Sequence, residues 1–168
     1  MPTGLKQTSS LIQVSATVTE SAANTFTVQQ IDLQLNPLDQ EVFVVQAVDL
    51  DLNPPNLVPG ATTQASFTVS STRRTTVGGI DQTNVIASKR ITTQEIGGAA
   101  VSNEYEASDT PASNLDYIAI IATNDFFLNI EGLANLAAVG ANARVYGYRA
   151  RADASVYAAL VQSEALSA

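Results

Sequence analysis

The chain contains neither histidine nor cysteine among its 168 residues. These two residue types supply the commonest general base, a frequent nucleophile and most transition-metal ligands of proteins. No nucleophile elbow, Walker loop or dinucleotide fingerprint occurs either. We therefore expect a protein that packs or binds rather than an enzyme, with no cofactor and no small-molecule substrate.

A D-x-D-x-N run from Asp49 to Asn53 begins like a calcium-binding loop. Pro54 then stands where such a loop needs its glycine, and Gly60 stands where it needs a bidentate glutamate. This departure excludes an EF-hand. We interpret Asp49 and Asp51 as outward-facing strand residues, and a weak Ca²⁺ site at the strand end stays open as the alternative.

Several carboxylates lie around one polar stretch, and two carboxylates are enough for glycoside hydrolysis. Nothing in the sequence sets a separation between them, however, and the chain has no tryptophan to form a sugar platform. The net charge of −8 disfavours nonspecific binding to nucleic acid or to an anionic membrane. Neither an enzyme nor a nucleic-acid-binding protein is indicated.

Charged residues make up only 14% of the chain, well below the roughly 25% of an ordinary domain. Thr, Ser, Asn and Gln carry the polarity instead, which suits a surface that contacts other copies of itself. The alternative is an ordinary β-domain, because strands favour Thr. The N-terminus has no apolar signal-peptide region, and no stretch approaches the roughly 18 apolar residues of a membrane span.

Apolar residues alternate with polar ones in a series of short runs, which predicts strands. Eight runs with no long helix between them predict an all-β fold, an antiparallel eight-stranded jelly-roll sandwich. The expected strands are Ile12–Val18, Phe26–Leu35 with a bulge at Gln29-Gln30, Glu41–Leu52, Ala65–Val69, Asn84–Thr93, Tyr117–Thr123, Phe126–Ile130 and Ala143–Ala152. The expected inward-facing residues are Val14, Phe26, Val28, Val44, Phe67, Val69, Ile118, Ile120, Phe126, Leu128 and Val145.

The sandwich is expected over residues 11–152, behind a flexible N-terminal arm of residues 1–10. The tail, residues 153–168, is rich in alanine and places apolar residues at i,i+4, which favours a short helix. A last strand through Val156–Val161 is the competing interpretation.

Two segments with little core character are the expected contact loops, because sandwiches carry function on their loops. Asn53–Gly60 is stiffened by prolines, and Gly97–Asn114 is long and acidic, which suits either an exposed rim or a salt-sensitive contact to the arginine pair of a neighbouring copy. The alternative is that both segments are plain surface connections. The candidate interface residues are Asn53, Pro54, Pro55, Pro59, Glu104, Glu106, Asp109, Arg73 and Arg74.

The polar arm, the strand-break-strand opening and the closing run YIAIIATNDFFLNIEGL…ARVYGYRARA resemble single-jelly-roll viral capsid proteins. The group concerned is the small major capsid proteins of icosahedral, internal-membrane viruses of archaea and thermophilic bacteria. The resemblance covers strand order and composition over most of the chain.

It implies a subunit of an icosahedral shell, located in the virion, whose partners are copies of itself and other virion proteins. A decoration or spike-base protein would show the same strands. A cellular carbohydrate-binding module is the third alternative.

Overall fold

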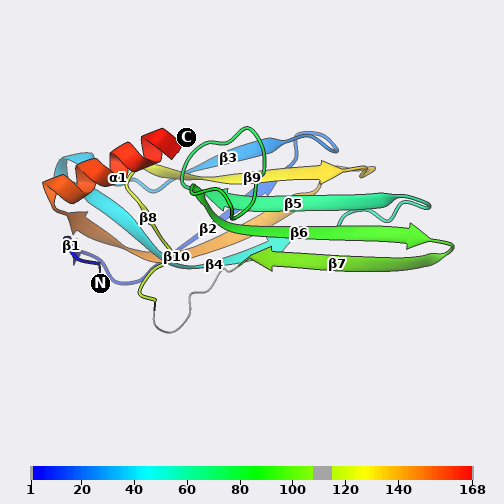
Figure 1. Ribbon diagram of the computed structural model, residues 1–168, viewed down its shortest axis with the longest axis horizontal. Helices are drawn as coiled ribbons and strands as arrows, with labels where there is room; N and C mark the ends of the chain where they lie inside the picture. Colours follow the sequence, from blue (N-terminus) through cyan, green and yellow to red (C-terminus); the bar gives the residue numbers. More distant parts are fainter. Residues whose placement is uncertain (1, 108–114, 168) are drawn as a thin grey trace.

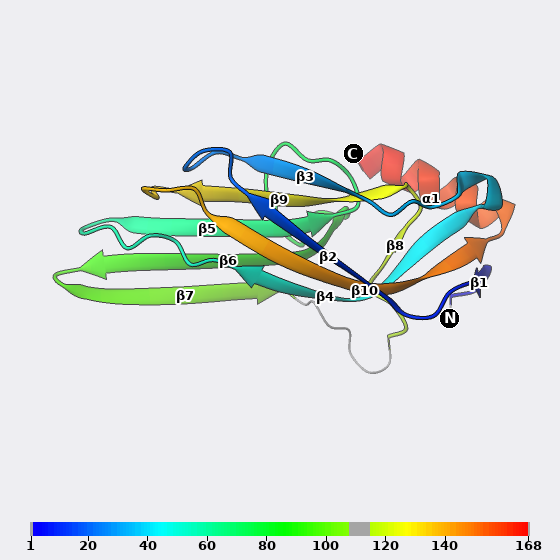
Figure 2. The ribbon, with the colours of Figure 1, turned by 180° about the vertical axis from the view of Figure 1, so that it is seen from behind.

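The computed structural model describes residues 2–107 and 115–167, which form two antiparallel sheets and one C-terminal helix. The first sheet contains β1 (Leu5–Gln7), β2 (Ile12–Thr19), β4 (Glu41–Leu52), β8 (Ala119–Ile121) and β10 (Gly140–Ala152). The second contains β3 (Thr27–Asp32), β5 (Thr62–Ser70), β6 (Val85–Ile96), β7 (Ala99–Ala107) and β9 (Asp125–Leu133). The sheets face each other, and α1 (Ala154–Ser167) lies at one end (Figures 1 and 2).

Eight of the strands follow the jelly-roll order. The first sheet places β2, β10, β4 and β8 side by side, and the second places β3, β9, β5 and β6 side by side. Along the chain every step between these eight strands crosses from one sheet to the other, except the β5–β6 hairpin. This connectivity confirms the predicted fold, with β1 and β7 as additional edge strands.

The segment expected as a flexible arm contains β1, which corrects that interpretation. β1 pairs with the end of β10, Leu5 opposite Ala152, and so continues the edge that β2 occupies further along. Leu5 is buried against the cluster under α1. Leu5 is a single apolar residue in a polar segment, so the sequence shows no periodicity there. Its burial depends on α1, at the other end of the chain.

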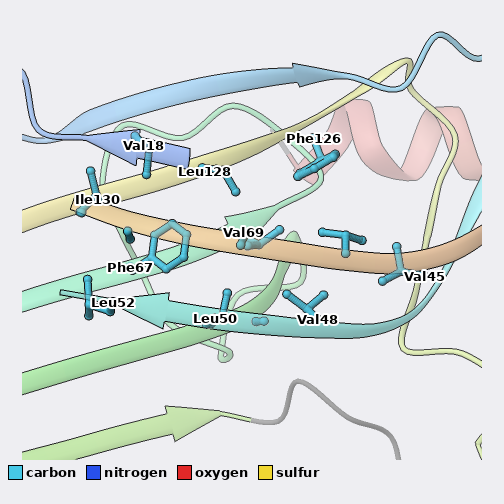
Figure 3. Close-up of a cluster of buried hydrophobic side chains, with 14 of the residues drawn as sticks. Val18, Val45, Val48, Leu50, Leu52, Phe67, Val69, Phe126, Leu128 and Ile130 are labelled. Atoms are coloured by element: carbon cyan, nitrogen blue, oxygen red, sulfur yellow. The ribbon is translucent and has the colours of Figure 1, made fainter. Parts of the chain in front are cut away.

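The core lies between the sheets, where side chains of β4, β5, β9 and β10 meet (Figure 3). Among the predicted core residues, Phe67, Val69, Phe126, Leu128 and Val145 are fully buried there. Val14 and Ile118 are half-buried and pack against its margin. Alternation in these strands was therefore a sound guide to the buried face.

Val44 is buried on the opposite face of its sheet, under α1, and not between the sheets as predicted. It belongs to a second apolar cluster with Tyr148 and Ala150, and the half-buried Ile120 packs against the same cluster. The helix contributes four half-buried residues to it, Val156, Tyr157, Leu160 and Val161. This packing confirms the helix in the tail and explains why β4 is apolar on both faces at its start.

The second predicted strand is shorter than expected and has no bulge. β3 pairs with β9 in unbroken register, with Ile31 opposite the buried Phe126 and Val28 opposite Asn129. Ile31 therefore faces the core, whereas Val28 faces outward, and Phe26 precedes the strand half-buried. The strand ends at Asp32, and two residues later Gln34 adopts a left-handed backbone at φ 53°.

The segment Gly97–Asn114 was predicted to be a loop, but Ala99–Ala107 forms β7. A two-residue turn, Gly97-Gly98, joins β6 to β7, with both glycines at positive φ (61° and 86°). Positive φ at both central residues is what a type I′ hairpin requires. The alternation of apolar and polar residues did not predict β7, because neither of its faces is buried and its sequence therefore does not have to alternate.

Candidate interaction surfaces

One end of the sandwich, opposite α1, is formed by three loops and one turn that we call the loop end (Figure 1). It comprises residues 20–26, 53–61 and 134–139 together with the turn 97–98. Polar side chains fasten these segments to one another, so the loop end is a fixed surface rather than a set of separate connections.

Glu20 is the centre of this fastening. Its buried carboxylate accepts hydrogen bonds from the backbone N–H groups of Thr25 at 3.0 Å, Gly132 at 2.6 Å and Val139 at 2.8 Å. A carboxylate bound to three amides compensates its own burial and fixes three stretches of backbone. Glu20 therefore holds the turn that follows β2 against both ends of the loop between β9 and β10.

Three asparagines extend the network. Asn24 and the buried Asn135 are linked in both directions, since the amide of Asn24 donates to the Asn135 carbonyl at 2.9 Å and accepts from its N–H at 2.7 Å. The Asn135 side chain accepts from the N–H of Asn56 at 2.9 Å, and Asn56 in turn accepts from Leu136 and Ala137. The loop 53–61 is thereby joined to the other two loops.

Glu95 joins the turn 97–98 to the loop 53–61. Its carboxylate accepts from the N–H of Gly60 at 2.5 Å and from that of Gly98 at 2.6 Å. The hydrogen bond from Gly60, followed by that from Gly98, lowers the pKa of Glu95 below its ordinary value of 4.5. The charged carboxylate is thus the form that the loop end favours.

Large apolar side chains stand exposed on this fixed surface. Leu57 is 56% exposed and Leu136 is 77% exposed, and Leu133, the last residue of β9 next to the loop 134–139, is 59% exposed. The backbone N–H of Leu136 is held by its hydrogen bond to Asn56, so ordering this segment on docking costs little conformational entropy. Exposed apolar residues on a rigid scaffold are typical of a protein contact.

The candidate loop Asn53–Gly60 belongs to the loop end, as an irregular segment in the predicted position. Asn53, Pro54 and Pro59 are exposed, whereas Pro55 is buried and anchors the loop. The Asn53 N–H donates to the carbonyl of Gly140 at 3.0 Å, at the start of β10. Whether these residues contact a partner stays a prediction.

Glu104 and Glu106 lie on β7 rather than on a loop, and both pair within the same molecule. Lys89 on β6 lies 2.5 Å from Glu104 and 3.5 Å from Glu106. Burial lowers the pKa of Lys89, but the hydrogen bond that its ammonium donates to Glu104 and the two negative charges outweigh burial and raise that pKa above its ordinary value. Asp109, the third acidic candidate, lies outside the described residues.

The arginine pair lies in the segment between β5 and β6. Arg73 is exposed, and Arg74 donates to Thr76, Asn84 and Gln82 of its own segment. This segment covers part of the outer face of the second sheet, where Thr68 donates to the carbonyl of Val77 at 2.9 Å. Arg74 is thus occupied in holding its own loop, and Arg73 is the accessible member of the pair.

Asp49 and Asp51 point outward from β4, as interpreted, into a shallow hollow of about 630 Å³ on the first sheet. Asp49 accepts from the Tyr146 hydroxyl at 3.1 Å, and Asp51 accepts from the Asn142 amide at 3.1 Å. Within residues 2–107 and 115–167 no three acidic groups gather as a metal site would require. In the same part of the chain, no helix has the length and apolarity needed to cross a membrane.

The sequence did not reveal the fastening residues of the loop end, Glu20, Asn24, Asn56 and Asn135. Asn24 and Asn56 lie in turn-forming stretches, a signal that marks loops without indicating their partners. Glu20 gave no signal, because its partners are backbone amides, and two of the three lie more than 100 positions away along the chain.

No protein family profile matches the chain, and no curated protein matches it. Among solved structures, the chain resembles Desmodium yellow mottle tymovirus with 9% identity and a TM-score of 0.34, over 92% of this chain and 96% of that one. It also resembles a tailspike protein, gp49 from Acinetobacter baumannii bacteriophage Fri1, described as a capsular polysaccharide depolymerase. That match has 8% identity and a TM-score of 0.17, over 72% of this chain and only 20% of the tailspike. Both likenesses are too loose to bear on function.

Proposed function

We propose that this protein is a structural subunit of a virus particle, which assembles with copies of itself and with other virion proteins into an icosahedral shell. The observation that carries the proposal is the loop end. There, three loops are fastened by buried polar side chains, and leucines are left exposed on the fixed surface. Such a surface offers area for contact and holds no constellation for chemistry.

The jelly-roll connectivity supports the same proposal by analogy of fold, since virus shells use this sandwich widely. The low charge density is consistent with it, because charged residues are depleted at the centres of protein interfaces. A decoration protein would share these features, but would join a particle built by another subunit instead of building one.

Self-association of the purified chain tests the proposal. Sedimentation velocity at several concentrations and salt strengths, with electron microscopy of the heaviest fraction, is expected to show closed particles or defined oligomers. A chain that stays monomeric under every condition and forms no particles would overturn the shell role. A chain that stays monomeric but binds purified particles would identify a decoration protein.

The substitution Leu136→Asn connects the assembly to the loop end. It removes an exposed apolar contact while the backbone N–H of residue 136 keeps its bond to Asn56. Association is expected to weaken at least tenfold with unchanged melting. Leu38→Asn is the matched control, because Leu38 is 92% exposed on the short 3-10 helix Pro37–Asp39, at the opposite end of the molecule from the loop end. An equal effect of both substitutions would remove the loop end from the contact.

A further inference from the structure

β7 forms the margin of the second sheet and pairs there with β6 (Figures 1 and 2). Its first eight residues are exposed, and it contains neither proline nor a positive charge. Proteins usually protect such edges with lysines, prolines, bulges or a covering segment, because an open edge recruits further strands. An undefended edge of nine residues is a surface on which another strand can dock.

The two acidic residues of β7 do not protect this edge as single charges would. Glu104 and Glu106 face the inner side of the sheet, on which Lys89 lies between them and the core strand β5. The charge of this inner face is thus partly neutralised within the molecule. A neighbouring strand would meet an ion-paired cluster instead of two isolated carboxylates.

The outer face of β7 carries its two large side chains. Val101 is 58% exposed and Tyr105 is 54% exposed, and the Arg90 guanidinium lies 4.8 Å from the Tyr105 ring centroid. These side chains are separated by four positions, with Asn103 halfway between them. Val101 and Tyr105 therefore lie at equal distances on either side of Asn103, one β-branched and the other aromatic.

This equal spacing of two different side chains makes β7 complementary to a second, antiparallel copy of itself. A two-fold axis through Asn103, perpendicular to the sheet, places Tyr105 of one copy opposite Val101 of the other, and it does so twice. Aromatic and β-branched residues directly opposite each other stabilise antiparallel strands. The same axis places Glu104 opposite Ser102 and Glu106 opposite Ala100, so no two carboxylates face each other.

Other registers between two β7 strands are less favourable. An axis through Glu104 sets two glutamates opposite each other, and an axis through Tyr105 sets Glu104 opposite Glu106, which is unfavourable because like charges directly opposite repel. An axis through Ser102 avoids this repulsion but pairs fewer residues and leaves Tyr105 opposite Ala99. The axis through Asn103 pairs all nine residues.

From this register we infer that β7 of one molecule pairs with β7 of a second copy, antiparallel and centred on Asn103. The pairing joins two five-stranded sheets into one ten-stranded sheet across the two-fold axis. The inference deepens the proposed self-assembly and rests on it, since it names the contact that links two subunits.

Single cysteines test the pairing, because the chain has no cysteine of its own. In Asn103→Cys the two introduced cysteines face each other across the axis, at the roughly 4.5–5.5 Å separation of Cα atoms in opposite residues of antiparallel strands, which lies within the range of a disulfide. In Val101→Cys each thiol faces Tyr105 of the partner and lies four residues from its counterpart. Under mild oxidation the Asn103→Cys dimer is expected to form at least tenfold faster.

The double variant Val101→Cys/Tyr105→Cys gives a second, independent reading. It brings two thiol pairs into register and is expected to cross-link readily, whereas neither single variant does so at the same concentration. Cross-linking that is equally fast in Asn103→Cys and Val101→Cys overturns the inference, and so does a double variant that behaves like its parents. All these positions are exposed on one strand, so circular dichroism and melting are expected to match the wild type.

The outcomes separate this inference from the proposed function. Particles that form in the wild type, without selective cross-linking at position 103, overturn the β7 contact and leave the shell role intact. Selective cross-linking at position 103 in a chain that never forms particles supports the β7 contact and overturns the shell role. Asn103→Lys, which places two like charges on the axis, is expected to reduce association at least tenfold at low salt.

Discussion

Glu164 of α1 accepts a hydrogen bond from the backbone N–H of Ala122 at 2.8 Å, across 42 positions of sequence. Its second oxygen accepts from the neighbouring N–H of Thr123 at 2.9 Å. The carboxylate is buried, and it satisfies the backbone at the point where β8 has ended and β9 has not yet begun. The helix is therefore fixed by a specific polar contact as well as by its apolar packing.

Replacing Glu164 by alanine is expected to reduce the free energy of unfolding by about 2–4 kcal/mol, because the buried amide of Ala122 and the half-buried amide of Thr123 lose a charged acceptor. Urea denaturation monitored by circular dichroism measures this loss. Glu131→Gln is the matched control, since Glu131 is exposed on β9 and its neutralisation is expected to change stability by less than about 0.5 kcal/mol. Equal losses in the two variants would contradict the role assigned to Glu164.

Truncating Phe126 to alanine is expected to cost about 3–5 kcal/mol, because its side chain is fully buried between the sheets. Val28→Ala is the informative comparison, since Val28 faces outward in the observed register of β3. We expect it to cost less than about 1 kcal/mol. A large loss at Val28 would show that β3 is inserted with the opposite face inward.

Glu20→Gln is expected to loosen the loop end. The amide keeps one oxygen acceptor for the three N–H groups that the carboxylate binds, so at least one buried donor loses its partner. A stability loss of about 1–3 kcal/mol is expected, together with faster hydrogen exchange at Gly132 and Val139. Asp81→Asn, which neutralises an exposed carboxylate in the segment between β5 and β6, is expected to leave both exchange rates unchanged.

Acid is expected to weaken the link between the turn 97–98 and the loop 53–61. The pKa of Glu95 is lower in the folded chain than its ordinary value of 4.5, so its contribution to stability is complete above that value and is lost as the pH falls through the folded pKa. Amide proton shifts of Gly60 and Gly98 are expected to titrate together with a midpoint below 4.5. Glu95→Gln is expected to abolish this titration, and a midpoint above 4.5 would contradict the two hydrogen bonds.

The sequence by itself determined the elements that must bury one face. β4 was predicted with its observed bounds, Glu41–Leu52, and the helical tail followed from alanine content and apolar spacing. A strand with one buried face has to alternate, and this constraint is visible locally. The absence of histidine and cysteine likewise limits the chemistry that the side chains can perform.

Tertiary structure decided what depends on distant partners. β7 has no buried face, so its sequence carried no alternation, and only the register with β6 defines it as a strand. Val44 packs in the cluster under α1, a helix more than 100 residues later in the chain, so its own strand does not indicate which face it occupies. Val28 was predicted to face the core but faces outward, because an edge strand tolerates apolar residues on either face. Glu20 binds backbone amides, which are the same in every residue type. No pattern of side chains could therefore disclose where its partners lie, and only the fold brings them within hydrogen-bonding distance.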